Sequence, residues 1–248
     1  AMNSKWPAFL LGLGLGVGPY VKGAGRLPGE AEVLGSFDRL AVRDADSLSV
    51  CSQFGLIGRT RMFSDLVFAT DLWKKSLPPN PTDVVTLVIC DGKPGNETLL
   101  LAAKRMQERG LKIQPVLLDP NHDGNLLTHI QSQFSRTICW DPHRTELESF
   151  AERIGSSAVV VSNRAHGIIV AACYGVPTIC IHTDEKLKTI HDMLPSSSLL
   201  MAIRDIPDKL EAEVCSRILH RADHHSATVR DGARARAAAM EMIKYVFG

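Results

Sequence analysis

The chain of 248 residues is long enough for one large domain or two small ones. Apolar residues make up 45% of it and charged residues 22%, and its 28 Lys and Arg residues nearly balance its 27 Asp and Glu residues. This balance argues against nucleic acid as a partner, because no strongly basic surface is available, and any positively charged site must be local.

The first 80 residues are predicted to be the remnant of another α/β unit or a connection to it. The apolar, glycine-rich stretch at residues 6–17 is shorter than the roughly 20 residues of a membrane span, and it lacks the cleavage site of a signal peptide. It is therefore interpreted as a strand. A short strand at residues 39–42 leads into a helix with Asp46 or Ser47 as its N-cap. A further strand is predicted at residues 65–71, and the Pro-rich residues 77–82 are interpreted as a linker.

Residues 81–248 are predicted to form a Rossmann-like domain, because short apolar strands alternate with longer helical patterns. This alternation is typical of βαβ units and of a doubly wound, mostly parallel sheet. Two C-terminal helices end the chain. The strands are expected at residues 84–89, 112–118, 137–140, 158–161, 178–181 and 199–203, and the helices at residues 97–109, 125–134, 146–154, 166–174, 186–193, 207–220 and 226–247.

A polar turn at residues 162–167 carries Arg164 and His166 directly from an apolar strand into a helix. The N–H groups and the dipole of a helix N-terminus favour anions, and cationic side chains beside them strengthen such a site. Lys186 follows the next strand, and parallel strands end at the same edge of a sheet, where open α/β sheets bind ligands. The sequence therefore predicts a site for a small, highly charged anion.

Arg43 stands just beyond the strand at residues 39–42 and is a fourth candidate. Three of the four residues also fit a purely structural role. Arg43 has Asp38, Asp44 and Asp46 nearby as ion-pair partners, the histidine of the turn can cap its helix, and the lysine can be an ordinary surface residue. Only their joint placement at the ends of strands favours a shared ligand.

Three other patterns resemble metal or nucleotide sites, but no catalytic role is predicted for them. His220, His224 and His225 have no acidic or Cys partner at the spacing of a metal site and are expected in a solvated loop. The glycine repeat at residues 12–18 lacks the following helix of a dinucleotide-binding loop. The turn at residues 91–96 lacks the Gly-Lys-Ser/Thr ending of a P-loop and is interpreted as a strand-to-helix turn that borders the ligand.

The six cysteines are scattered, without a Cys-x-x-Cys pair or zinc spacing. Cys90, Cys173 and Cys180 lie in apolar patterns, where a buried, reduced thiol is expected. We therefore expect a reducing compartment and a cytoplasmic protein, either free or at the inner face of the membrane.

Several short motifs follow one another in a defined order over essentially the whole chain. They are Gly16-Val17-Gly18-Pro19, Val42-Arg43-Asp44 with Ser47 three residues on, Asp65-Leu-Val-Phe-Ala, Ser162-x-Arg164-x-His166, and Gly175-Val176-Pro177 with Lys186 twenty residues after the histidine. Each is short, but their order and spacing are fairly specific, and together they resemble the polysaccharide pyruvyl transferase family. The family's usual Arg-Leu-His is Arg-Ala-His here, and the turn after the strand at residues 84–89 lacks the arginine that the family pattern has.

The resemblance implies a GT-B-like pair of Rossmann-type domains, of which this sequence holds mainly the C-terminal, donor-binding half. The amino-terminal domain of the family should precede the glycine-rich strand, and almost all of it is absent from the sequence. Three explanations stay open: a truncated chain, a short variant, or a missing half that another polypeptide or a homo-oligomer supplies.

The resemblance also implies a reaction. Phosphoenolpyruvate would donate its pyruvyl group to two hydroxyls of one sugar in a surface polysaccharide or exopolysaccharide of the cell envelope, forming a ketal and releasing phosphate. The acceptor would be a saccharide or a lipid-linked saccharide. Arg43 and Arg164 would bind the phosphate and carboxylate through their forked donors.

In this scheme His166 would be the general acid–base and Lys186 would neutralise the departing phosphate. Ser162 and Gly167 would contact the substrate. No cofactor and no metal are required by the scheme.

Two other functions stay open. A GT-B nucleotide-sugar glycosyltransferase, with this chain as its donor domain, would share the sheet and the cationic helix N-terminus, although no acidic residue is placed to bind a ribose. A non-catalytic saccharide-binding module of the same fold is the second. Tight binding of a uridine or guanosine diphosphate would favour the first, and saccharide binding without any response to phosphoenolpyruvate would favour the second.

Overall fold

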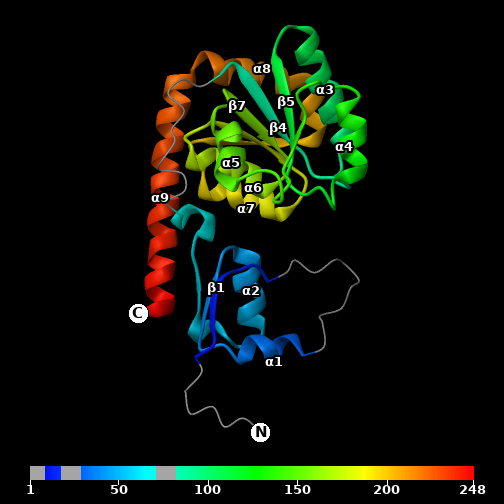
Figure 1. Ribbon diagram of the computed structural model, residues 1–248. Helices are drawn as coiled ribbons and strands as arrows, with labels where there is room; N and C mark the ends of the chain where they lie inside the picture. Colours follow the sequence, from blue (N-terminus) through cyan, green and yellow to red (C-terminus); the bar gives the residue numbers. More distant parts are fainter. Residues whose placement is uncertain (1–8, 18–28, 71–81) are drawn as a thin grey trace. The chain divides into compact units, whose positions relative to one another are not determined.

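The computed structural model describes residues 9–17, 29–70 and 82–248 (Figure 1). The chain divides into two units, of which the smaller comprises Ala1–Ala69 with Ala235–Gly248 and the larger comprises Thr70–Arg234. The domain boundary predicted at residues 80 and 81, and the predicted linker up to residue 81, lie outside the described residues, as do Gly18 and Pro19.

The larger unit is built on a six-stranded sheet with the strand order β6-β5-β4-β7-β8-β9, in which every neighbouring pair is parallel. Helices connect the strands in the alternation expected from the sequence (Figure 1). The strands are β4 (Val84–Val88), β5 (Lys112–Leu117), β6 (Ile138–Cys139), β7 (Val159–Ser162), β8 (Thr178–His182) and β9 (Ser198–Ala202), and the helices are α3 (Asn96–Glu108), α4 (Gly124–Gln131), α5 (Leu147–Gly155), α6 (Ala165–Cys173), α7 (Glu185–Met193), α8 (Ile206–Leu219) and α9 (Arg221–Phe247).

Helices cover both faces of this sheet because its strands are apolar on both sides. Alternate residues such as Leu87 and Val161 point to one face, where they share a core with α3, α4 and α8. Helix α6 contacts α5 and α7, and these three helices pack on the other face, where Val88 lies against α6 (Figure 1). The doubly wound, mostly parallel Rossmann-type sheet predicted from the sequence is confirmed.

The strand order reverses between β4 and β7. The chain winds outwards from β4 through β5 to β6, then returns to β7 and winds through β8 to β9. Open α/β sheets bind ligands at the carboxyl ends of the strands beside such a reversal. The turns that follow β4 and β7 are therefore the places where a ligand site is expected.

The smaller unit has a three-stranded parallel sheet with the order β1-β2-β3 and its own apolar core, which includes Leu40, Val42 and Cys51. The C-terminal part of α9 belongs to this unit, where the Tyr245 hydroxyl donates a hydrogen bond to the Arg59 carbonyl at 2.8 Å. The elements are β1 (Leu11–Leu15), α1 (Glu30–Gly35), β2 (Arg39–Val42), α2 (Ala45–Gln53), η1 (Ile57–Arg59), β3 (Thr60–Met62) and η2 (Leu66–Ala69).

Two predictions about this unit are wrong, both because an aspartate side chain bonds to the backbone. The strand predicted at residues 65–71 is the 3₁₀ turn η2, since the Asp65 carboxylate accepts the Val67 N–H at 3.0 Å and starts a turn. The N-cap of α2 is Asp44 and neither Asp46 nor Ser47, because the Asp44 side chain accepts the Ser47 N–H at 2.7 Å.

The solvated loop predicted around His220, His224 and His225 is also wrong. Only His220 lies between α8 and α9, and the other two histidines are in the first turns of α9. His225 Nδ1 bonds to the Gly175 carbonyl at 2.8 Å, and His224 Nδ1 lies 3.1 Å from Nη1 of Arg217. Tertiary contacts therefore extend this helix beyond the start that its sequence pattern suggests.

The cysteines follow their predictions except for Cys173. All six are free, and Cys90 and Cys180 are buried as expected, whereas Cys173 is only partly buried. The glycine-rich stretch expected as a strand forms β1. Over the described ranges, every helix is too short or too polar to cross a membrane.

Candidate functional site

The carboxyl ends of β4, β5, β7 and β8 bring four connections to one edge of the larger sheet. These connections lead into α3, α4, α6 and α7, so their residues lie beside helix N-termini. A cavity of about 590 Å³ opens at the turn after β4. It is lined by Cys90, Asp91, Gly92, Lys93 and His122.

The turn between β7 and α6 is shaped by Ser162. Its hydroxyl accepts the Arg164 N–H at 3.0 Å and donates to the Arg164 carbonyl at 2.7 Å, and the residue is fully buried. A Cβ at Gly167 would lie 2.5 Å from this hydroxyl and 2.8 Å from Cβ of Val88, so only glycine allows α6 to approach β4 this closely. The structure gives Ser162 and Gly167 a role in the shape of the turn, and their contact with substrate stays a prediction.

Two asparagines tie the turn after β7 to the turn after β4. Asn163 is buried, and its side-chain oxygen accepts the Cys90 N–H at 2.9 Å. Its amide nitrogen donates to Asn96 at 2.6 Å, and Asn96 in turn donates to the Cys90 carbonyl at 2.9 Å. The two turns beside the reversal of strand order are therefore held as one rigid assembly.

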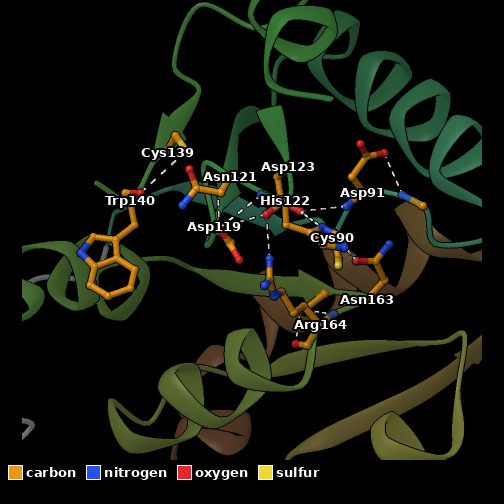
Figure 2. Close-up of polar contacts among 12 residues, drawn as sticks. Cys90, Asp91, Asp119, Asn121, His122, Asp123, Cys139, Trp140, Asn163 and Arg164 are labelled. Atoms are coloured by element: carbon orange, nitrogen blue, oxygen red, sulfur yellow. Dashed lines mark hydrogen bonds and ion pairs between the residues drawn. The ribbon is translucent and has the colours of Figure 1, made fainter. Parts of the chain in front are cut away.

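Asp123, at the end of the connection after β5, is the centre of the polar network (Figure 2). Its side chain is completely buried and accepts four hydrogen bonds. One oxygen accepts from the Asp91 N–H at 3.0 Å and from His122 Nδ1 at 3.0 Å. The other accepts from Nη1 of Arg164 at 2.7 Å and from the Asp119 N–H at 3.2 Å. One carboxyl group thus joins the connections after β4, β5 and β7.

Asp123 is ionised despite its burial. Burial alone would raise the pKa of this carboxyl group, because a low dielectric disfavours its charged form. The hydrogen bonds from the Asp91 amide and from His122, together with the charge of Arg164, outweigh burial and hold the pKa below its ordinary value. The side chain is therefore a carboxylate at neutral pH and orients its two basic partners.

The predicted cations lie at this edge in different settings. Arg164 is the N-cap residue of α6, and its side chain is held by Asp123. His166 is the second residue of α6 and is exposed, and Lys186 is the second residue of α7 and is half-buried. Lys93 pairs with Asp184, the N-cap of α7. The structure thus places Arg164, His166 and Lys186 after the neighbouring strands β7 and β8, as the sequence suggested.

Arg43 belongs to the smaller unit. Its Nη1 lies 3.1 Å from an oxygen of Asp65, and its guanidinium packs against Gly16, where a Cβ would come within 3.1 Å of Nε. Ser47 accepts the Val17 N–H at 2.7 Å, so the motif around Arg43 fixes the end of the glycine-rich strand. Within its own unit Arg43 has a carboxylate partner, and its contact with substrate stays a prediction.

A possible metal-binding set lies beside the cavity. Cys90, His122 and Asp123 each offer one ligand atom, and these atoms lie within 4.8 Å of one another. Sulfur, imidazole nitrogen and carboxylate oxygen are donors that suit zinc. The carboxylate of Asp123, however, already accepts four hydrogen bonds, one of them from the cation Arg164 at 2.7 Å. A divalent ion would have to displace one of these donors and lie close to a positive charge, so this set fits a metal poorly.

Sequence reasoning missed His122, Asp123 and Asn163 as members of the site. The signal was present, because His122 and Asp123 follow a predicted strand at its carboxyl end, the position that selected Arg164. The histidines near residue 220 were considered as metal ligands instead, because they are clustered in sequence. Contacts between distant segments, such as that from residue 164 to residue 123, leave no local pattern.

The chain matches the family model for polysaccharide pyruvyl transferase over residues 3–185. No curated protein matches the chain in sequence.

Several solved structures share the fold. UDP-GlcNAc 2-epimerase from Neisseria meningitidis, bound to UDP-GlcNAc, has a TM-score of 0.52 at 11% identity, over 85% of this chain and 61% of that one. Anabaena Alr3699/HepE in complex with UDP has a TM-score of 0.54 at 10% identity, over 87% and 66%. TarM has a TM-score of 0.52 at 12% identity, over 85% and 42%. The present chain spans less than two thirds of the length of each of these proteins. At these identities the likeness concerns the fold alone.

Proposed function

Because the chain belongs to the polysaccharide pyruvyl transferase family, we propose that it moves the pyruvyl group of phosphoenolpyruvate to two hydroxyls of one sugar, forming a ketal and releasing phosphate. Family membership supports a transferase that modifies polysaccharide, and the donor and the ketal are our proposal. The observation that carries it is the row of cationic side chains after β4, β7 and β8 of one sheet edge, which includes Lys93, Arg164 and Lys186.

The charge of the donor explains why such an edge would be needed. Phosphoenolpyruvate carries a phosphate and a carboxylate within a few bonds of each other, so several fixed cations must face it. The guanidinium of Arg164 is oriented by Asp123 through Nη1, and its fork carries further N–H donors. The first turns of α6 and α7 add backbone N–H groups with the positive end of the helix dipole. We propose that Arg164 binds the donor anion, and binding of the donor by Arg43 stays a prediction from the sequence.

The proposed reaction balances without a cofactor or a metal. Carbon C3 of the donor gains a proton, which leaves an oxocarbenium-like centre at C2 for the first sugar hydroxyl. The bond from C2 to the phosphate oxygen then breaks, and the second hydroxyl completes the ketal. We propose His166 as the acid for C3 and Lys186 as the cation that faces the departing phosphate. The acceptor is proposed to be a saccharide or a lipid-linked saccharide of the cell envelope.

Calorimetric titration with phosphoenolpyruvate tests donor binding. Arg164→Lys keeps a positive charge beside Asp123 but loses the fork, and Lys186→Ala removes the second cation. A charge-assisted hydrogen bond contributes about 1.5–3 kcal/mol, so each variant should bind about 10- to 100-fold more weakly. Lys188→Ala is the matched control, because Lys188 is exposed on the same helix and pairs with Asp192. Equal weakening in the control, or none in the two site variants, would contradict the proposal.

Turnover is tested by phosphate release and by NMR detection of a ketal, with phosphoenolpyruvate and a panel of alkyl hexopyranosides as acceptors. His166→Gln should abolish product formation while leaving donor binding largely intact. The fold is shared with proteins solved in complex with UDP or UDP-GlcNAc, so UDP is the competing ligand to test. Tight binding of UDP without ketal formation would favour a nucleotide-sugar glycosyltransferase. Saccharide binding without a response to phosphoenolpyruvate would favour a non-catalytic module.

A further inference from the structure

His122 is a second histidine of the site, and neither the family motifs nor the predicted constellation includes it. Its ring lines the 590 Å³ cavity together with Lys93 and Cys90, and its side chain is 57% exposed. The residue that follows it in the chain, Asp123, is completely buried and bonds to its Nδ1 at 3.0 Å (Figure 2). An accessible imidazole is thus held by a buried carboxylate at the wall of a cavity.

The partner of His122 determines which of its nitrogens carries the proton. Asp123 is ionised, so its oxygens only accept hydrogen bonds, and Nδ1 of His122 must be the donor. In the neutral ring Nε2 then carries a lone pair. Among the described residues, Nδ1 is the ring nitrogen of His122 that has a hydrogen-bond partner. The ring therefore presents a basic nitrogen that the rest of this network does not occupy.

We propose that His122 is a second acid–base residue of this site and that Asp123 is its positioning residue. This inference rests on the proposed function, because it names the group that accepts a proton from the acceptor sugar. Asp123 fixes the Nδ1–H tautomer and stabilises the imidazolium that forms when Nε2 takes a proton. The same carboxylate holds Arg164, so the base and the anion-binding cation are placed by one side chain.

The proton count of the reaction leaves a role for such a group. Ketal formation removes two protons from the sugar, one from each hydroxyl that bonds to C2. One proton is gained by C3 of the donor when its double bond is lost, and the other is gained by the phosphate oxygen that leaves C2. The proposed acid, His166, supplies the proton to C3 and regains one from the second attacking hydroxyl. We assign the proton of the first attacking hydroxyl to His122, which takes it at Nε2 and passes it to the departing phosphate.

The decisive variant is His122→Ala, because the ring is accessible and its loss leaves no buried cation unpaired. Loss of a general base lowers rates by about 10²- to 10⁴-fold, so we expect kcat to fall in that range. The dissociation constant of phosphoenolpyruvate should stay close to the wild-type value, since the base acts on the acceptor. Added imidazole should restore part of the lost rate in this variant. His143→Ala is the control, because His143 is an exposed histidine of the same unit, and it should keep the wild-type rate.

The outcomes separate this inference from the proposed function. If the wild type neither binds phosphoenolpyruvate nor releases phosphate, the proposed function fails and the inference fails with it. If the wild type turns over and His122→Ala is equally fast, only the inference is overturned. A slow His122→Ala that binds the donor much more weakly and gains nothing from imidazole also overturns it, because the ring would then serve binding.

Nitrogen-15 NMR of the histidine rings tests the positioning role of Asp123 without any turnover. In the wild type, the neutral form of the His122 ring should carry its proton on Nδ1 and have a bare Nε2, and Asp123→Asn should lose this preference. The opposite tautomer in the wild type would overturn the assignment, whether or not the variant folds. Stoichiometric binding of Zn²⁺ that is lost in Cys90→Ser would also overturn it, because His122 and Asp123 would then be metal ligands.

Discussion

Replacing Asp123 by asparagine should destabilise the larger unit severely, although the change removes only one charge. Four donors converge on the two carboxylate oxygens, from the amides of Asp91 and Asp119 and from the side chains of His122 and Arg164. An asparagine has one oxygen, so in either orientation its NH₂ group faces at least one N–H group that can only donate. The variant therefore loses at least one hydrogen bond and leaves Arg164 without its counter-charge.

The size of the effect follows from burial. The Asp123 side chain is 0% exposed and that of Arg164 is 22% exposed. Removing one partner of a buried ion pair costs about 3–5 kcal/mol, because the remaining charge is uncompensated in a low dielectric. An Asp→Asn change at an exposed ion pair should cost less than about 1 kcal/mol. Asp192, which pairs with Lys188 on the surface of α7, supplies that matched control.

The destabilisation should also depend on pH, in a direction that the structure fixes. The pKa of Asp123 lies below its ordinary value of 3.8, so its carboxylate contributes to folding stability in full above that value. This contribution is lost as the pH falls through the folded-state pKa, because the wild-type side chain then becomes neutral as well. The difference between wild type and Asp123→Asn should therefore be large at neutral pH and shrink in acid.

Urea denaturation of both proteins and of Asp192→Asn, repeated from neutral to acidic pH, measures these differences. A loss in Asp123→Asn no greater than that in Asp192→Asn would refute the argument that the buried network stabilises the fold. A constant difference at all pH values would refute the assignment of an ionised Asp123.

Three further predictions concern other positions. Gly167→Ala should cost about 1–3 kcal/mol in urea denaturation, because its Cβ would overlap the side chains beneath α6, whereas Gly124→Ala, whose Cβ meets nothing within 4 Å, should not destabilise the protein. Ser47→Ala should cost about 1–3 kcal/mol and speed hydrogen exchange at the Val17 amide, which loses its buried acceptor, and unchanged exchange would contradict this. Burial raises the pKa of Tyr174 to about 12, so ultraviolet titration should show a late phenol ionisation that Tyr174→Phe abolishes, and stability should fall as the pH rises above the ordinary value of 10.0.

The larger sheet was predictable because its strands are buried on both faces. Continuous apolar runs such as that of β7, separated by helical patterns and glycines, identify βαβ units without knowledge of tertiary contacts. The edge that holds Arg164, His166 and Lys186 follows from the same rule, since parallel strands end together. In the smaller unit the strands are short, and the polar sequence Thr60–Met62 of β3 gave no pattern to detect.

What escaped prediction is the set of interactions that depend on three dimensions. The apolar residues after Asp65 favoured a strand. The Asp65 carboxylate instead binds the backbone N–H of Val67 and starts a turn, a local competition that the apolar pattern does not reveal. Asp123 holds Arg164 although the two residues are 41 positions apart, and no periodic sequence pattern predicts such a contact. Residue type and position at the end of a strand gave candidates, and only the fold determined which carboxylate accompanies which cation.

The two ion pairs at this edge differ in how readily an anion can replace their carboxylates. Asp123 is buried and bonded to four groups, so the cost of separating Arg164 from it is high, and that guanidinium must bind a ligand with its remaining donors. Lys93 and Asp184 are 29% and 30% exposed, so water screens their ion pair more than the pair formed by the buried Asp123. The phosphate of the proposed donor would therefore displace Asp184 from Lys93 at a lower cost than Asp123 from Arg164. In the proposed function, Arg164 is the fixed cation that sets the geometry and Lys93 is the exchangeable one that adds charge to the site.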